Sequence, residues 1–236
     1  MTRRRRRRSP RPATLIGVAL ALVAVGFLLD RFAPAQDLPW KPFNLNRPLG
    51  WATHVQLAWI GYDQTRCEAA LADGDVGFTP APAQSEGACH VLNGGRLGEG
   101  LAPLKPSGPL MSCQEALAFA AWERHAVEPA AYTAFGRGVV QIEHFGTYAC
   151  RPIRGQRHGL SEHAFANAID VSGFRLSDGR MVSVLKDFRD PGPRGVFLHR
   201  VHEGGCLVFG HTLGPDFNAD HKDHLHLDMG LWGPCR

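Results

Sequence analysis

Two short segments of the chain concentrate side chains that bind metal ions. Residues 161–170 read SEHAFANAID, and residues 221–228 read HKDHLHLD. Zinc prefers imidazole nitrogen and carboxylate oxygen, and a catalytic zinc site has three protein ligands and one open position. His163, Asp170 and His226 would supply two neutral ligands and one anionic ligand. We therefore expect these three residues to bind one Zn²⁺ ion.

The second segment also holds candidates for proton transfer, because hydrolysis at a metal needs a base within hydrogen-bond reach of the attacking water. Asp223 precedes His226 by three residues, and an irregular backbone before the strand would let its carboxylate turn toward the metal. His224 precedes His226 by two residues, so both side chains point to one face of a strand. From spacing alone, His224 suits either a base or an oxyanion donor, and the choice between it and Asp223 stays open.

Most of the twelve histidines need no such role, since exposed histidines are common. Those that we interpret as ordinary surface or half-buried residues include His54, His90, His125, His199, His202 and His211. An arginine beside a cysteine, such as Arg151, is more often a surface or ion-pairing residue than part of a binding site.

The elements that position these residues follow from the pattern of apolar and turn-forming residues. Ser112 and Glu115 have the spacing of a capping box, and helical periodicity follows, so we predict a helix over 113–125. Pro129 suits the first turn of a second helix that ends at Gly136. Further predicted elements are a hairpin of 138–146 with 147–151, strands at 168–174, 181–185, 206–210 and 224–229, and a helix at 195–202. Helices first and antiparallel strands afterwards predict an α+β domain.

The chain begins with a basic tail at 1–12, which holds seven arginines and no acid. Residues 13–29 follow without a charge, near the lower length limit for a membrane-spanning helix. Positive charge stays on the cytoplasmic side, so we predict a transmembrane signal anchor at 13–30 and export of everything after it. A cleavable signal peptide is the alternative, because Ala33-Pro34-Ala35 has the small-x-small form of a cleavage site.

The rest of the chain divides into a linker and one domain. Four prolines between 31 and 64 predict a semi-extended linker, and a globular domain is expected over 65–236. Without the arginines of the tail, the chain has 19 basic and 22 acidic residues. Because the positive charge is confined to the tail, we do not expect nucleic acid as a partner.

All six cysteines lie on the exported side of the anchor, and their even number predicts disulfides in an oxidising compartment. The sequence does not choose among the possible pairings, although Cys67 and Cys89 are near enough in the chain to close a modest local loop. No CxxC pair is present, so a cysteine zinc cluster is not expected.

The motifs YACR, LSEHAFANAIDVSGF and LGPDFNADHKDHLHLDM, together with the cysteines, resemble the bacterial extensin-like protein C-terminal domain over about 65–236. That domain is similar to the hedgehog and D-Ala-D-Ala peptidase zinc fold. The motif of that fold is S-x-H-x6-D, followed later by an HxH or by a histidine that Glu or Asp precedes by three residues. The matching residues are Ser161, His163, Asp170, Asp223 and His226, with His224 and His226 as the HxH of the penicillin-insensitive murein endopeptidases and His221 as their further histidine.

The resemblance implies an antiparallel sheet with helices on one side, preceded here by one transmembrane helix. Two positions depart from the peptidase pattern. Ala166 stands where a glycine usually follows the first histidine by three residues, so the local backbone is in question. Leu225 replaces an aromatic residue that often adjoins the last histidine.

The activity that the resemblance implies is zinc-dependent cleavage of peptide bonds in peptidoglycan stems or cross-links. Asp223 would be the general base and His224 an auxiliary acid or oxyanion donor, with His221 or His224 as the alternative base. Arg151 would bind a substrate carboxylate, and Ser161 would hydrogen-bond the peptide.

The expected partners are peptidoglycan peptides and, through residues 13–29, the inner membrane, with the domain in the periplasm. A protein of another class is the alternative, namely a non-catalytic wall-binding or scaffolding module with a structural zinc.

Overall fold

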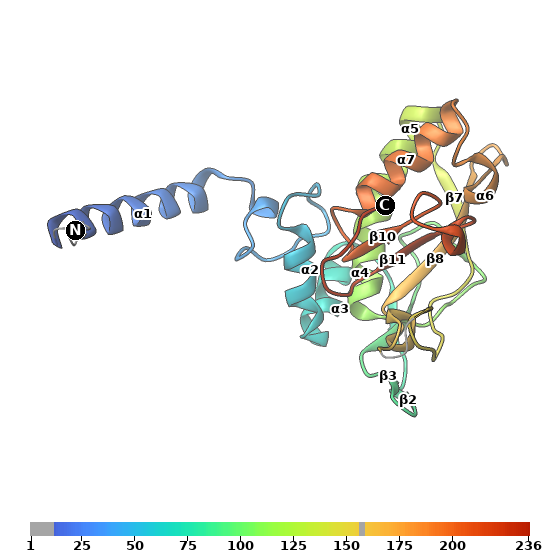
Figure 1. The fold of residues 1–236 in the computed structure, drawn as a ribbon, viewed down its shortest axis with the longest axis horizontal. Coiled ribbons are helices and arrows are strands. Elements are labelled where there is room, and N and C mark those ends of the chain that lie inside the picture. The colour runs from blue at the N-terminus through green and yellow to red at the C-terminus, as the bar shows by residue number, and fades with distance from the viewer. Residues whose placement is uncertain (1–11, 156–158) are drawn as a thin grey trace, which may run out of the picture.

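The computed structural model describes residues 12–155 and 159–236, and shows a single helix, α1, that projects from a folded body (Figure 1). Helix α1 spans Pro12–Phe32, and none of its residues is buried. At 1.5 Å per residue, its 21 residues extend about 31 Å, which matches the hydrocarbon thickness of a bilayer. The helix is long and apolar enough to cross a membrane, as a signal sequence also would be. The predicted basic tail lies, except for Pro12, outside the described residues.

The predicted linker at 31–64 is instead largely folded onto the body. It contains a 3₁₀ turn, η1 (Ala35–Asp37), and helix α2 (Thr53–Gly61). Leu45 and Leu57 belong to the main hydrophobic core. The Gln56 amide donates hydrogen bonds to the carbonyls of Ala35 and Leu38, both at 2.8 Å. The prolines lie outside the helices of this stretch, between apolar residues that reach the core, so proline content alone predicted an extended linker.

The body is an α+β structure built on a six-stranded, mostly antiparallel sheet, which confirms the predicted class. The strand order is β10-β11-β8-β7-β5, and β9 pairs with β8 off this path. Only the short contact between β5 and β7 is parallel among these pairs. The strands are β5 (Leu104–Lys105), β7 (Val139–His144), β8 (Ala168–Leu176), β9 (Met181–Ser183), β10 (His211–Leu213) and β11 (Leu225–Asp228).

Helix α4 (Cys113–Trp122) forms the centre of the core against this sheet. The Ser112 hydroxyl accepts a hydrogen bond from the Glu115 amide at 3.0 Å, which confirms the predicted start of the helix. The Trp122 ring packs 6.0 Å from that of Phe174 on β8, and its indole N–H donates to the Val201 carbonyl at 2.9 Å. The remaining helices are α3 (Gln64–Asp73), a π-helix η2 (Glu123–Val127), α5 (Glu128–Phe135), α6 (Val184–Asp187) and α7 (Pro193–Gly205).

Two predicted strands are wrong. Residues 147–151 form no strand, because β7 pairs with the distant β8 instead of closing a local hairpin. Residues 206–210 form turns, because α7 continues to Gly205 and the chain needs room to reverse before β10. Outside the main sheet lie two small sheets, which are formed by β1 (Phe78–Pro80), β4 (Gly94–Leu97) and β6 (Met111–Ser112), and by β2 (Gln84–Glu86) and β3 (Cys89–Val91).

All six cysteines form disulfides, as their even number predicted, but the suggested local loop between Cys67 and Cys89 is not formed. Each of these two cysteines pairs with a more distant residue that the fold brings near. The three bonds are Cys67–Cys113, Cys89–Cys150 and Cys206–Cys235. The first joins α3 to the start of α4, and the second fixes the chain just before Arg151.

Candidate metal centre

Strand pairing brings Asp170 and His226 side by side. Asp170 on β8 lies directly opposite His226 on β11 in the antiparallel register. Residues opposite each other across two strands project from the same face of the sheet, while their neighbours project from the other face. Ile169 and Leu227 accordingly enter the hydrophobic core. Asp170 and His226 both project from the other face of the sheet, where Oδ1 of Asp170 lies 2.8 Å from Nδ1 of His226.

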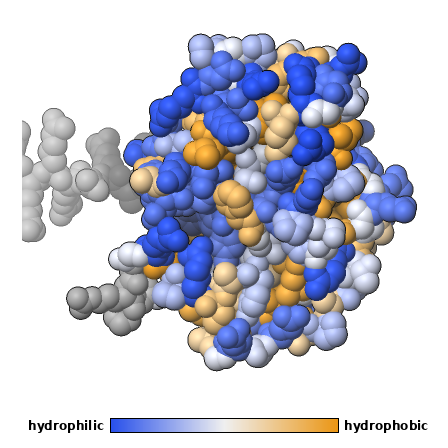
Figure 2. All heavy atoms as spheres, turned by 90° about the vertical axis from the view of Figure 1, so that its right-hand side faces the viewer, coloured by the Kyte–Doolittle hydropathy of each residue, from blue (hydrophilic) through white to orange (hydrophobic). Residues whose placement is uncertain are grey.

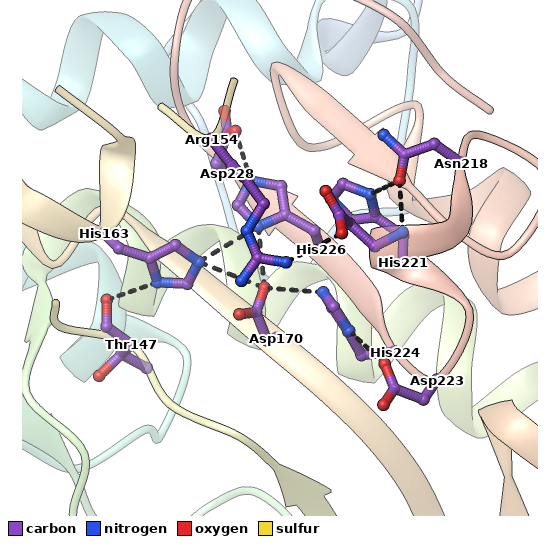
Figure 3. A network of polar contacts seen from close by, with 11 residues as sticks. Thr147, Arg154, His163, Asp170, Asn218, His221, Asp223, His224, His226 and Asp228 are labelled. Carbon is purple, nitrogen blue, oxygen red and sulfur yellow. Dashed lines mark hydrogen bonds and ion pairs between the residues drawn. The ribbon is translucent and has the colours of Figure 1, made fainter. Parts of the chain in front are cut away.

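His163 completes the group from a short 3₁₀ helix, η3 (Glu162–Phe165), that precedes β8. Its Nε2 atom lies 3.2 Å from Oδ1 of Asp170 and 3.2 Å from Nδ1 of His226 (Figure 3). Ligand atoms around a tetrahedral zinc ion, each about 2.0–2.1 Å from the metal, lie about 3.4 Å apart. The three predicted ligands therefore converge with a spacing close to that of a zinc site.

Hydrogen bonds on the outer sides of both rings decide which nitrogens face the centre. Nδ1 of His163 lies 3.0 Å from the carbonyl oxygen of Thr147, which only accepts, so Nδ1 carries the proton and Nε2 is left with a lone pair. Nε2 of His226 lies 2.9 Å from Oδ2 of Asp228, so a neutral ring has its lone pair on Nδ1. Two nitrogen lone pairs and one carboxylate oxygen then face one point, an arrangement that could hold a cation.

The pKa values of His226 and Asp170 indicate that the cluster favours a positive charge. Burial alone lowers the pKa of His226, but hydrogen bonds to Asp170 and Asp228 and their negative charges outweigh it and raise the pKa to about 10. Burial raises the pKa of Asp170, yet hydrogen bonds to His163 and His226 hold it well below its usual range. Without a metal ion, a proton on His226 would take the place of the cation.

Sequence reasoning missed two residues of the centre, Asp228 and His211. The second oxygen of Asp228 accepts hydrogen bonds from His211 Nδ1 at 2.8 Å and from the Gly230 amide at 2.9 Å. This network fixes the carboxylate that orients His226. A signal for Asp228 was present, because His224, His226 and Asp228 alternate. No such signal marked His211, which reaches Asp228 only through the register of β10 against β11.

Asp223 and His224 lie together at the edge of the centre. Oδ1 of Asp223 is 2.9 Å from Nδ1 of His224, and Nε2 of His224 is 3.5 Å from Oδ1 of Asp170. The Asp223 carboxylate therefore contacts the centre through the imidazole of His224 in this structure (Figure 3). His221 lies nearby, with its ring tilted by 45° to that of His224 and the two centroids 5.2 Å apart. Burial, followed by the charges of His226 and His224, lowers the pKa of His221 to about 4, so it is neutral at neutral pH.

The centre opens into a cavity of about 840 Å³, within the range of small-ligand sites. Arg151 and Ser161, the two predicted substrate residues, both line it and are joined by a backbone hydrogen bond of 3.1 Å. Its wall also contains apolar side chains and further charged ones. These include Phe145, Ile153, Leu160 and Phe217 among the apolar residues, and Arg154, Asp220 and Lys222 among the charged ones.

A second group of metal-capable side chains consists of His202, Cys206 and Cys235. Both of its sulfurs are joined in a disulfide, so neither is a thiolate able to bind a metal ion. Within the described ranges, 12–155 and 159–236, the cluster of His163, Asp170 and His226 is therefore the stronger metal candidate.

The fold and the site define a mixed α+β domain with a His-Asp-His cluster, in which both histidines are buried and the aspartate is half-buried, that opens into a cavity. The chain belongs to the family described as "Extensin-like protein C-terminus", whose model matches residues 65–236. This confirms the family resemblance predicted from the sequence motifs. No curated protein and no solved structure matches the chain.

Proposed function

We propose that the chain is a zinc peptidase that cleaves peptide bonds in peptidoglycan stems or cross-links. The observation that carries the proposal is the convergence of three acceptor atoms, Nε2 of His163, Oδ1 of Asp170 and Nδ1 of His226, within 2.8–3.2 Å of one another. Two imidazoles and one carboxylate suit zinc, whereas Ca²⁺ and Mg²⁺ prefer oxygen ligands alone. The motif resemblance to peptidoglycan peptidases supports the choice of substrate.

Bound Zn²⁺ would lower the pKa of a water molecule and polarise the carbonyl of the scissile bond. The residues Asp223 and His224 would handle the proton. The Asp223 carboxylate accepts the Nδ1 proton of His224, which leaves Nε2 of the ring as an acceptor 3.5 Å from Oδ1 of Asp170. In this geometry His224 would take the proton of the attacking water and deliver it to the leaving amine, while Asp223 would stabilise the imidazolium. Direct acceptance of the proton by Asp223, which the family resemblance implies, is the alternative, since only Oδ1 of its carboxylate contacts His224.

The cavity supplies groups that suit a peptide carrying free carboxylates. Arg151 would bind a substrate carboxylate and Ser161 would hydrogen-bond the peptide backbone, and both are placed on the cavity wall. Arg154 and Lys222 add positive charge to the same wall, although Arg154 is paired with Asp220 at 2.9 Å. A planar guanidinium binds carboxylates with two parallel hydrogen bonds, which a lysine cannot do. Arg151 is therefore a better anchor than Lys222, and it is preferred to Arg154 because Arg154 is already paired with Asp220.

The place of action would be the periplasmic face of the inner membrane. Helix α1 would cross the bilayer once with the arginine-rich tail in the cytoplasm. The three disulfides would then form on the exported, oxidising side.

A second candidate function is a wall-binding module with a structural zinc. A structural zinc site has four protein ligands, and His221 or His224 would be the fourth. Nε2 of His224 lies 3.5 Å from Oδ1 of Asp170. If His224 closes the site, no position is left for water, and the protein binds wall fragments without cleaving them.

Incubation of the zinc-loaded full chain with cross-linked muropeptides separates the two functions. We expect cleavage of a peptide bond that a chelator abolishes, with no release of sugar. Fragments that bind without any product across several stem-peptide types would replace the peptidase with the wall-binding module.

A further inference from the structure

The tryptophans of this chain are distributed in an unusual way. Of five, only Trp122 is in the core, where it is fully buried. The other four are exposed: Trp40 at 54%, Trp51 at 87%, Trp59 at 66% and Trp232 at 64%. Tryptophan is a large apolar side chain that is highly buried on average, so four exposed rings in one protein call for an explanation.

All four exposed tryptophans lie in or against the segment that follows α1. Trp40 and Trp51 belong to the stretch between α1 and α2, and Trp59 is on α2. Trp232 comes from the C-terminal end, but its ring packs edge-on against that of His54 on α2, with centroids 5.1 Å apart. Figure 1 shows this stretch and α2 on the side of the body from which α1 projects.

Helix α2 presents an aromatic face away from the core. Its buried residues are Thr53, His54, Gln56 and Leu57. Val55 and Trp59 lie four residues apart on the other side of the helix, and Trp51 and Tyr62, just before and just after α2, are 87% and 91% exposed. No residue of α2 is charged, whereas the neighbouring α3 carries Arg66, Glu68 and Asp73. An exposed helix face without charged residues is unusual, because the outer face of a surface helix normally carries charged and polar side chains.

The end of α1 is tied to this segment. Oδ1 of Asp30, in the last turn of α1, accepts a hydrogen bond from Trp40 Nε1 at 2.8 Å and pairs with Lys41 Nζ at 2.7 Å. These contacts keep Trp40 at the level where α1 ends. If α1 spans a bilayer, that level is the headgroup layer.

We propose that Trp40, Trp51, Trp59, Tyr62 and Trp232 form one surface that rests in the headgroup layer of the membrane that α1 crosses. The proposal relies on the membrane span of the proposed function. Trp and Tyr favour this layer because each has an apolar body and one polar group that still reaches water. The face turned away from α1 differs, since it is mostly hydrophilic with apolar residues in small separate groups (Figure 2).

The contact can be measured on the full chain in vesicles made with lipids brominated near the headgroup, because bromine quenches tryptophan fluorescence at short range. The emission of Trp51 and Trp59 is obtained as the difference between wild type and Trp51→Phe/Trp59→Phe. We expect brominated lipid to reduce this difference at least about two-fold and aqueous acrylamide to reduce it little. A variant with all four exposed tryptophans changed to Phe retains Trp122 and should respond to neither quencher.

Each other outcome has a distinct meaning. A chain that floats with the vesicles, but whose Trp51 and Trp59 respond to acrylamide and not to brominated lipid, retains the anchor and overturns the surface contact. Protection from both quenchers, together with cross-linked dimers, would assign the surface to a second copy of the chain and also overturn the proposal. Failure to float would overturn both the anchor and the contact.

Discussion

The carboxylate of Asp228 lies 2.9 Å from Nε2 of His226, on the side of the ring opposite to Asp170. It therefore determines which nitrogen of His226 faces the metal centre. His211 and the Gly230 amide hold the other oxygen of the same carboxylate. Metal-binding histidines commonly depend on such an outer partner for their orientation and basicity.

Asp228→Ala should weaken zinc binding about 10- to 100-fold, because the His226 ring loses the acceptor that fixes its proton on Nε2. The measurement is competition for zinc with a chromophoric chelator. Asp220→Ala is a matched control, since it removes another carboxylate from the same cavity. The Asp220 carboxylate pairs with Arg154 and contacts no proposed ligand. Equal affinities of the two variants would show that Asp228 does not orient His226.

The purified chain should contain about one zinc ion, and either His163→Ala or His226→Ala should remove it, because two remaining ligands cannot hold the ion. Elemental analysis after dialysis measures the content. His199→Ala, on α7 and outside the cavity, should leave the content unchanged. Full retention of metal by both site variants would mean that other residues are the ligands.

Asp223→Asn and His224→Ala should each keep the fold and lower the rate of cleavage about 10²- to 10⁴-fold, because each removes a group of the proton-transfer pair. The double variant should be little slower than the slower single one, since residues that act as a unit are not additive. Single-turnover rates on a cross-linked muropeptide test this.

Unchanged cleavage by Asp223→Asn together with loss in His224→Ala would leave His224 as a base that needs no orientation by Asp223. The opposite result would make Asp223 the base itself, as the sequence predicted.

Glu123 should lower the free energy of unfolding as the pH rises from about 5 to 8. Burial raises the pKa of Glu123 to about 7, although the Ala102 amide, which donates to it at 2.7 Å, acts in the opposite direction. The folded state then binds more protons than the unfolded state between pH 4.5 and 7, so the stabilisation present below pH 4.5 is lost as the pH passes 7. The loss is at most about 3 kcal/mol, at 1.36 kcal/mol per pKa unit.

Glu123→Gln should flatten this pH dependence, which can be measured by urea unfolding of the full chain in detergent at pH 5 and pH 8. Glu115, which is fully buried and whose pKa burial also raises, contributes to the slope of both proteins and cancels in the comparison. Identical slopes would show that Glu123 is ionised in the folded state at both pH values.

The metal cluster could be predicted from the sequence because its information is local. The segment 161–170 fixes the spacing of His163 and Asp170, and alternation along a strand places His226 on one face. The role of His211 could not be predicted, since its contact with Asp228 depends on which strand pairs with β11 and in which register. The same limit applies to the disulfides, whose partners are 29 to 61 residues apart.

Ala166 shows that a non-glycine residue can hold a backbone conformation that glycine favours. It adopts the left-handed conformation, with φ of 52°. An alanine in this region costs about 1 kcal/mol or slightly more. The conformation is retained at that cost, while the Ala166 amide bonds to the His163 carbonyl at 3.2 Å and closes the turn that holds the first ligand.

The folded stretch between α1 and α3 limits how far the centre can travel. An extended spacer of about 30 residues would span about 90–100 Å and let the domain search a deep layer above its anchor. Here η1 and α2 are packed on the body, and Asp30 holds Trp40 and Lys41 at the end of α1. With α1 in the bilayer, the centre stays within about 40 Å of the lipid, the diameter expected for a body of this size. If the proposed peptidase activity holds, an anchored domain of this kind would reach only the peptidoglycan that lies close to the membrane.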